Sequence, residues 1–197
     1  MKFTENNIRP KKLIDKGKKY LKQDIIYLLN FKKKFVKVNC PACKSNVKSF
    51  MFTKNDFNYV SCDRCKTFYI NPRPTEKILN KFYDSSKLYD YWNNFIFPAT
   101  EKVRSKKIFL PRALKIIQIV KKFKIKRNFI MDIGAGYGTF CQVIKGKKFF
   151  KKVIALEPNK EGSKKCIEKK IYTLNASIEK VKKKDIKDVN VATSFEV

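Results

Sequence analysis

The sequence predicts an α/β fold in which a parallel sheet follows a small cysteine-rich module and a helical linker. Three observations lead to this prediction. An apolar run that begins at Phe129 passes directly into three alternate glycines at positions 134, 136 and 138. A second strand-like segment, 153–156, ends in the acidic Glu157, and two CxxC pairs lie upstream of both.

The glycine-rich stretch NFIMDIGAGYG, residues 128–138, is typical of a buried strand that enters a tight turn. Glycines accept backbone angles that a Cβ forbids, and they let a ligand lie against bare main chain. Thr139 begins a segment with helical spacing, so the helix N-terminus would face that ligand. Glu157 follows Gly138 by 19 residues, a spacing at which an acidic side chain can accept both hydroxyls of a ribose. The two signals together predict a nucleoside-containing cofactor, although an ordinary turn with a solvated Glu157 stays open.

The glycine register distinguishes between cofactors. A dinucleotide fingerprint would require a third glycine at position 139, where this chain has Thr139, so a nicotinamide-dependent dehydrogenase is disfavoured. The pattern D-x-G-x-G-x-G resembles the first motif of class I S-adenosylmethionine-dependent methyltransferases, and VIALEPN at 153–159 resembles their second. The segments 175–179 and 190–197 extend the resemblance weakly. The resemblance implies S-adenosylmethionine bound by Asp132, Gly134, Ala135, Gly136, Gly138, Glu157, Pro158, Ala176 and Ser177.

Four cysteines predict a metal site upstream of these motifs. Cys40, Cys43, Cys62 and Cys65 have the spacing C-x2-C-x18-C-x2-C, which falls in the range for zinc sites. Four thiolates form a closed tetrahedral shell with no open position, so the zinc would be structural. The strand-like segments 47–52 and 57–60 would form the hairpin of a zinc ribbon. The other two cysteines, at 141 and 166, are expected in the core or at the surface rather than as ligands.

Composition limits the possible partners. The 197 residues include 47 Lys and Arg against 17 Asp and Glu, a formal net charge of +30. Only six of the 47 are Arg, and the 41 Lys are scattered through every segment, whereas base reading favours the planar Arg fork. No specific nucleic-acid partner is therefore expected. A weak, salt-sensitive attraction to polyanions is expected from the net charge. With neither a secretory signal nor a transmembrane segment, and with CxxC pairs typical of a reducing compartment, the sequence predicts a cytoplasmic protein.

The order of the segments predicts four regions. They are a helical, basic segment at 1–39, a zinc ribbon at 40–72, a helical linker with an aromatic segment at 73–126, and a partial Rossmann-like S-adenosylmethionine-binding domain at 127–197. CxxC pairs followed by Pro-Arg-Pro and a Tyr-rich segment resemble zinc-ribbon methyltransferases associated with sugar and surface-polysaccharide biosynthesis. In that resemblance the Tyr-rich segment lies over the cofactor, while an apolar core between domains is the simpler explanation of the aromatic residues.

Right-handed crossovers predict the strand order 3-2-1-4. The sheet of the resembled family continues past the fourth strand, so the sequence predicts an incomplete, C-terminally truncated domain whose exposed fourth strand could self-associate. The expected function is transfer of a methyl group to a small-molecule or sugar-type acceptor, with Glu196 as a candidate base. The alternative is a non-catalytic zinc-ribbon protein that binds nucleic acid.

Overall fold

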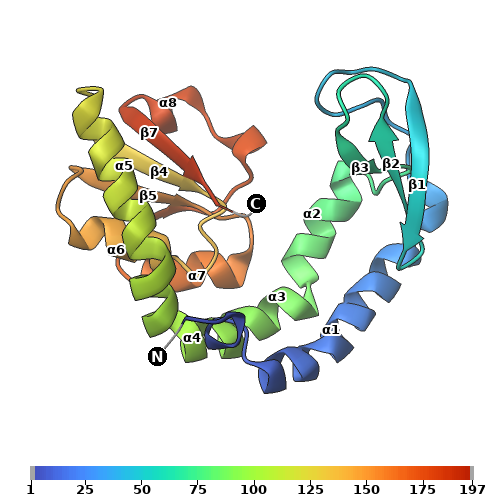
Figure 1. Cartoon of the computed structure of the whole chain (residues 1–197), viewed down its shortest axis with the longest axis horizontal. Coiled ribbons are helices and arrows are strands. Elements are labelled where there is room, and N and C mark those ends of the chain that lie inside the picture. Colours follow the sequence, from blue (N-terminus) through green and yellow to red (C-terminus); the bar gives the residue numbers. More distant parts are fainter. Residues whose placement is uncertain (1–2, 196–197) are drawn as a thin grey trace. The chain divides into compact units, whose positions relative to one another are not determined.

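The structure is a computed structural model that describes residues 3–195. The chain divides into two compact units (Figure 1). One unit combines the N-terminal residues up to Lys18 with everything from Leu88 onward, and the other comprises Lys19–Lys87. The helix α1, Lys11–Leu29, contributes residues to both units.

The Lys19–Lys87 unit contains a three-stranded antiparallel sheet in the order β1-β2-β3. Asn55 and Asp56 form the turn between the first two strands with φ angles of 52° and 61°, a region that these side chains tolerate better than most. A helix follows the sheet, and the Thr75 side chain caps it by accepting from the Ile78 amide. The elements are β1 Lys48–Lys54, β2 Phe57–Cys62, β3 Phe68–Ile70 and α2 Glu76–Ser85.

The other unit begins with a nearly continuous helical run and continues as alternating strands and helices. Short 3-10 turns occur at Glu5–Asn7, Lys32–Lys34 and Ile178–Lys180 along the chain. The elements from the helical run onward are α3 Lys87–Tyr91, a π-helical turn Trp92–Ile96, α4 Phe97–Arg104, a second π-helical turn Ser105–Phe109, α5 Leu110–Lys122, β4 Phe129–Ile133, α6 Thr139–Gly146, β5 Lys152–Leu156, α7 Lys160–Glu168, β6 Tyr172–Leu174, α8 Lys183–Ile186 and β7 Val189–Ser194.

The sheet of this unit is parallel, with the order β6-β5-β4-β7. This is the predicted order 3-2-1-4, so the predicted Rossmann-like topology is confirmed for these strands. Residues alternate between the two faces of each strand. Ile130 of β4 and Ala155 of β5 join the cluster with α5, α6 and α7, whereas Met131 and Leu156 pack against residues that follow β6. Because the strands are parallel, the carboxyl ends of β4 and β5 lie at the same edge of the sheet.

The helical run before the sheet is longer than the sequence predicts, because apolar spacing within the 73–126 linker indicates helices only at 76–83 and at about 111–123. The structure is helical from Lys87 to Lys122, with two π-helical turns inside the run. Each π turn inserts an extra residue and shifts the phase of the apolar positions, so the 3.6-residue period is lost in the sequence.

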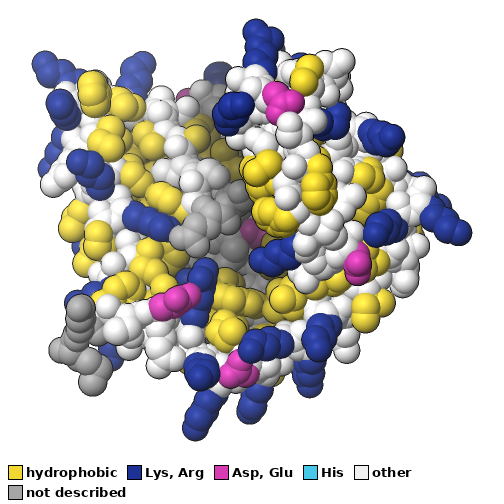
Figure 2. Space-filling view, turned by 45° about the vertical axis from the view of Figure 1, so that its right-hand side comes forward, with side chains coloured by type: hydrophobic (Ala, Val, Ile, Leu, Met, Phe, Trp, Pro, Cys, Tyr) yellow, Lys and Arg dark blue, Asp and Glu magenta, His cyan; other side chains and the backbone are white. Residues whose placement is uncertain are grey.

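The space-filling view shows lysine and arginine side chains spread around the visible face rather than gathered in one stripe (Figure 2). Among the described residues, none of the helices combines the length and apolar character needed to cross a bilayer.

Candidate cofactor site and metal centre

The glycine turn after β4 is tied to the end of β5. Gly134, Gly136 and Gly138 all adopt positive φ angles, of 71°, 53° and 75°, which explains why glycine stands at each position. The amides of Gly134 and Ala135 donate to the carbonyl oxygen of Leu156 at 2.8 and 3.1 Å. The turn is therefore fixed against the neighbouring strand before any ligand is bound.

Glu157 points at this turn. Its side chain is buried, Oε2 accepts from the Gly136 amide at 2.6 Å, and Oε1 accepts from the Asn159 amide at 2.9 Å. Burial raises the pKa of the Glu157 carboxyl, and the two amide donors partly oppose that shift. Each carboxylate oxygen has a second lone pair, so the group can still accept from a ligand hydroxyl. The sequence placed Glu157 beside the glycine turn, and the structure brings the two together.

The space around the glycines shows where a ligand fits. A Cβ built on Gly136 meets no atom within 4 Å, so this part of the turn borders open space. A Cβ on Gly138 would stand 2.8 Å from the Cys166 Sγ, so packing against α7 also requires glycine at that position. A Cβ on Gly162 in α7 would stand 3.0 Å from the Glu157 Cγ and 3.1 Å from the Gly136 carbonyl oxygen. Gly162 was missed in the sequence analysis, because a glycine inside a helix carries no signal for such a contact.

The loop after β6 is hydrogen-bonded to the main chain at Glu157 and Pro158. Asn175 Nδ2 donates to the carbonyl oxygens of Glu157 and Pro158, at 2.9 and 3.0 Å. Ala176 packs on the apolar cluster on the β4 and β5 face, and the Ser177 Oγ is buried without a hydrogen-bond partner among the described residues. A buried hydroxyl with no partner is costly, and a bound ligand would satisfy it.

Asp132, near the end of β4, is buried between neighbouring elements. Its Oδ1 accepts from the Thr193 Oγ1 of β7 at 2.7 Å, and its Oδ2 lies 3.8 Å from the Cys141 Sγ of α6. Burial raises the pKa of Asp132 to about 6. The hydrogen bonds with Thr193 and Cys141 lower this pKa in part, and the nearby Glu157 charge raises it further. Asp132 is therefore in contact with side chains on β7 and α6.

The helical run before the sheet also contacts the glycine turn. The rings of Phe97 and Tyr137 have centroids 5.6 Å apart, and Tyr137 belongs to the turn itself. The Asn93 Nδ2 donates to the Asn159 Oδ1 at 3.4 Å, two residues after Glu157. The segment therefore contacts both the glycine turn and the end of β5 within its unit. Glu196, the candidate base, lies outside the described residues.

The residues gathered at this edge fit a nucleoside cofactor: bare main chain at Gly136, a carboxylate one strand away, and a buried hydroxyl without a partner. Comparison with known families agrees with that chemistry. Residues 111–196 match the family model of the FtsJ-like methyltransferases. The matched range contains the glycine turn, Glu157 and all four strands of the parallel sheet. This part of the chain has a Rossmann-like methyltransferase fold. No curated protein matches the chain.

The four predicted zinc ligands come together in the other unit. Their Sγ atoms all lie within 4.8 Å of one another, with 3.5 Å between Cys40 and Cys65 and 3.6 Å between Cys43 and Cys62. Tetrahedral coordination at a Zn–S distance of about 2.3 Å requires sulfurs about 3.8 Å apart, so the four thiols fit a zinc ion.

The two knuckles that hold these cysteines have the same form. The Lys44 amide donates to the Cys40 carbonyl and the Lys66 amide to the Cys62 carbonyl, at 2.9 and 2.8 Å. Both lysines have positive φ, at 61° and 60°. This repeated geometry shows two equivalent turns that each present two sulfurs to one point.

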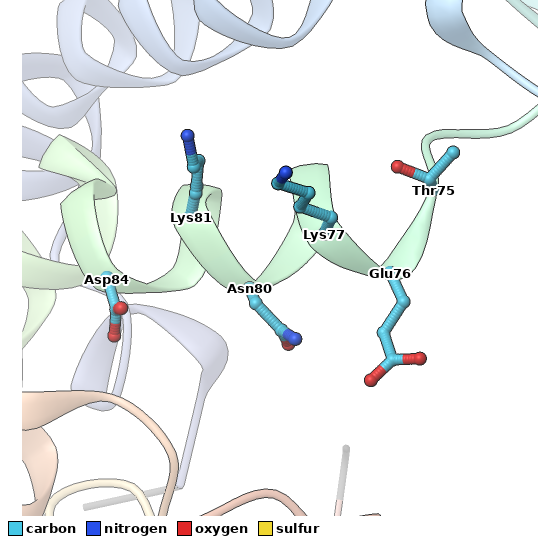
Figure 3. A pocket seen from close by; sticks show the side chains of 6 residues that line it. All are labelled: Thr75, Glu76, Lys77, Asn80, Lys81 and Asp84. Atoms are coloured by element: carbon cyan, nitrogen blue, oxygen red, sulfur yellow. The ribbon is translucent and has the colours of Figure 1, made fainter.

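A hollow along α2 in the same unit does not resemble a binding site. Figure 3 shows Lys77 and Lys81 extending to one side of the helix, and Glu76 and Asp84 to the other. Side chains that diverge from one helix cannot converge on one ligand. The lining residues are Thr75, Glu76, Lys77, Asn80, Lys81 and Asp84.

Proposed function

We propose that this protein is an S-adenosylmethionine-dependent methyltransferase that acts on a small-molecule or sugar-type acceptor. The observation that supports it most is the Glu157 carboxylate facing the bare Gly136 main chain across the carboxyl ends of two parallel strands. In this proposal Glu157 accepts the ribose hydroxyls, Gly134, Gly136 and Gly138 border the methionine part, and Ala176 and Ser177 flank the adenine.

The chain's own residues would bind and align rather than react. The bound cofactor supplies an electrophilic methyl group, and the protein's main task is to hold an acceptor atom within near-attack distance. Asp132 would favour the cofactor's ammonium group by charge, and Glu196 stays the candidate base. The zinc-bound ribbon would be structural. A cytoplasmic location goes with the proposal, because free thiolate ligands require a reducing compartment.

Calorimetric titration with S-adenosylhomocysteine, the stable product form of the cofactor, tests the proposal on zinc-loaded protein. The wild type is expected to bind, and Glu157→Gln to bind about 10- to 100-fold more weakly, because hydrogen bonds to a charged group contribute about 1.5–3 kcal/mol. A folded wild type that shows no binding would refute the cofactor site.

Two glycines provide a matched pair for the same titration. Gly162→Ala places a Cβ against the Glu157 side chain and is expected to weaken binding, while the gain in helix propensity offsets part of its cost in stability. Gly146→Ala, at the end of α6, meets no atom within 4 Å and should leave affinity unchanged. Equal affinities for the two variants would contradict the proposed position of the Glu157 carboxylate.

A nucleic-acid acceptor is the second candidate. The FtsJ-like match and the net charge of +30 favour it, and three partly exposed aromatic rings lie together on the ribbon sheet. Phe52, Tyr59 and Phe68 have centroids 4.9 to 6.2 Å apart, a platform on which bases could stack. Titration with single-stranded RNA tests this candidate. Binding that weakens steeply with salt, and that is lost in Phe52→Ala and in Phe68→Ala, would favour a nucleic-acid acceptor over a sugar.

A further inference from the structure

Asn93 is a buried polar residue in the π-helical turn Trp92–Ile96. It is 3% exposed, and its Oδ1 has no hydrogen-bond partner among the described residues. A buried amide oxygen left without a donor costs roughly 1–3 kcal/mol, so such groups call for an explanation. π-helical turns are also frequent at functional sites, where the extra residue redirects a side chain.

The neighbours of Asn93 fix which way its amide points. The group that faces it is the Asn159 Oδ1, which accepts from the Gly162 amide at 2.9 Å and caps α7. An acceptor must be met by a donor, so the Asn93 Nδ2 faces Asn159 and its Oδ1 is directed elsewhere. Flipping the amide would bring two oxygens together. The orphan atom is therefore an acceptor, and it suits a ligand that donates.

The position of Asn93 limits what that donor can be. The main-chain amide of Asn159 donates to the Glu157 carboxylate, which also accepts from the Gly136 amide. Asn93 contacts Asn159, so one residue connects it to the proposed ribose site. Phe97 of the same helical run contacts Tyr137 of the glycine turn. The donor groups that a nucleoside cofactor presents at this end of the site are its ribose hydroxyls.

We propose that the Asn93 Oδ1 accepts a hydrogen bond from a ribose hydroxyl of the nucleoside cofactor, which makes Asn93 a cofactor-binding residue contributed by the segment before the sheet. The inference rests on the proposed function. It explains why a polar side chain stands at a buried position where an apolar one would pack at lower cost. It also gives the helical run a direct role in binding, beyond covering the glycine turn.

The test is calorimetric titration of the zinc-loaded full chain with S-adenosylhomocysteine. Asn93→Ala is expected to bind about fivefold more weakly, the loss of one neutral hydrogen bond. Asn94→Ala is the matched control, because Asn94 is the exposed neighbour in the same turn and donates to the Asp90 carbonyl. The 2′-deoxy and 3′-deoxy forms of the ligand identify the hydroxyl: the Asn93→Ala penalty should disappear with the form that lacks it.

Thermal unfolding of the ligand-free protein separates binding from structure. Trp92, the single tryptophan, reports on this unit by its fluorescence. Asn93→Leu should unfold at a temperature no lower than the wild type, because it removes an unsatisfied buried oxygen, and should still bind more weakly. A lower unfolding temperature with unchanged affinity would assign Asn93 a structural role and overturn the inference.

The remaining outcomes separate this inference from the proposed function. Absence of binding by the wild type would overturn both. Wild-type binding with Asn93→Ala equal to Asn94→Ala would overturn the inference alone. A full Asn93→Ala penalty with both deoxy ligands would also overturn it, because neither ribose hydroxyl would then be the partner.

Discussion

The ribbon and the parallel sheet of this protein are stabilised in different ways. The ribbon has a buried cluster of only four residues, Cys40, Val60, Cys62 and Tyr69, and two of them belong to the four cysteines that could hold a zinc ion. The sheet and its helices share a cluster of eleven buried residues. A module with so little apolar burial cannot fold on that burial alone, so we expect a bound metal to contribute most of its stability, whereas the sheet can rely on apolar packing.

The cysteines show the same contrast at the level of one side chain. In the sheet unit, burial raises the pKa of Cys166 to about 12 and that of Cys141 well above its usual value. In the ribbon, hydrogen bonds from the Thr67 hydroxyl and amide lower the pKa of Cys65 to about 6. The Ser45 amide lowers the pKa of Cys43, but the neighbouring thiols and burial outweigh it and raise that pKa to about 12. The two cysteines of the sheet unit are therefore packed, protonated groups, whereas the ribbon holds a ready thiolate at Cys65.

Metal removal should have the largest effect, and it should be confined to one region. Zinc contributes about 10–16 kcal/mol of apparent binding energy in small zinc modules, so a strong chelator should unfold the ribbon. In ¹H–¹⁵N spectra the amide signals of 40–72 are expected to collapse toward random-coil positions, while Trp92 fluorescence stays native.

Single cysteine variants check the assignment of the metal. Cys62→Ser should lose bound zinc, measured by metal analysis, whereas Cys141→Ser in the sheet unit should keep it. Native ribbon signals in the presence of the chelator would show that apolar packing suffices there.

Truncating a core side chain should destabilise the sheet unit and leave the ribbon intact, the reverse of metal removal. Ile130 of β4 is fully buried, so Ile130→Ala should destabilise the sheet unit by about 2–5 kcal/mol and leave the zinc content unchanged. Denaturant titration followed by Trp92 fluorescence measures the change. Ile119→Ala on α5 is the control, because Ile119 is 41% exposed and its truncation should change stability by less than about 0.5 kcal/mol. Similar losses for both would mean that the sheet has no well-packed core.

The buried Asp132 should make the stability of the sheet unit depend on pH. Its pKa is raised from 3.8 to about 6, so the folded state holds the proton more tightly than the unfolded state, and stability falls as the pH rises from about 4 to about 6. Asp132→Asn removes this term. It should be more stable than the wild type at pH 7, by at most about 3 kcal/mol, and the gap should close toward pH 4. Thermal unfolding across that range measures the gap, and a gap that is independent of pH would contradict the burial argument.

The smallest effect concerns the second zinc knuckle. Lys66 has a φ of 60°, which glycine adopts without strain, so Lys66→Gly should stabilise the zinc-bound ribbon by about 0.5–1 kcal/mol. Competition with a chromophoric chelator should then show zinc held about two- to fivefold more tightly. Lys48→Gly in β1 serves as control and should weaken retention. A loss of affinity in Lys66→Gly would mean that the lysine side chain itself supports the site.

The sequence predicted the parts of this structure that depend on local pattern. The strands beside the glycine turn and the four clustered cysteines both follow from residue types at short spacing. Gly162 and Asn93 could not be predicted, because each matters through a side chain that only the fold brings near. The π-helical turns were missed since they break the period on which helix prediction depends.

A crystal structure of the zinc-loaded protein with S-adenosylhomocysteine tests the central claim most directly. The ribose hydroxyls should lie about 3 Å from the Glu157 carboxylate, with the ligand's amino-acid part along Gly136 and its adenine beside Ala176 and Ser177. An adenosyl group bound elsewhere, or a Glu157 side chain that makes no contact with it, would contradict the account.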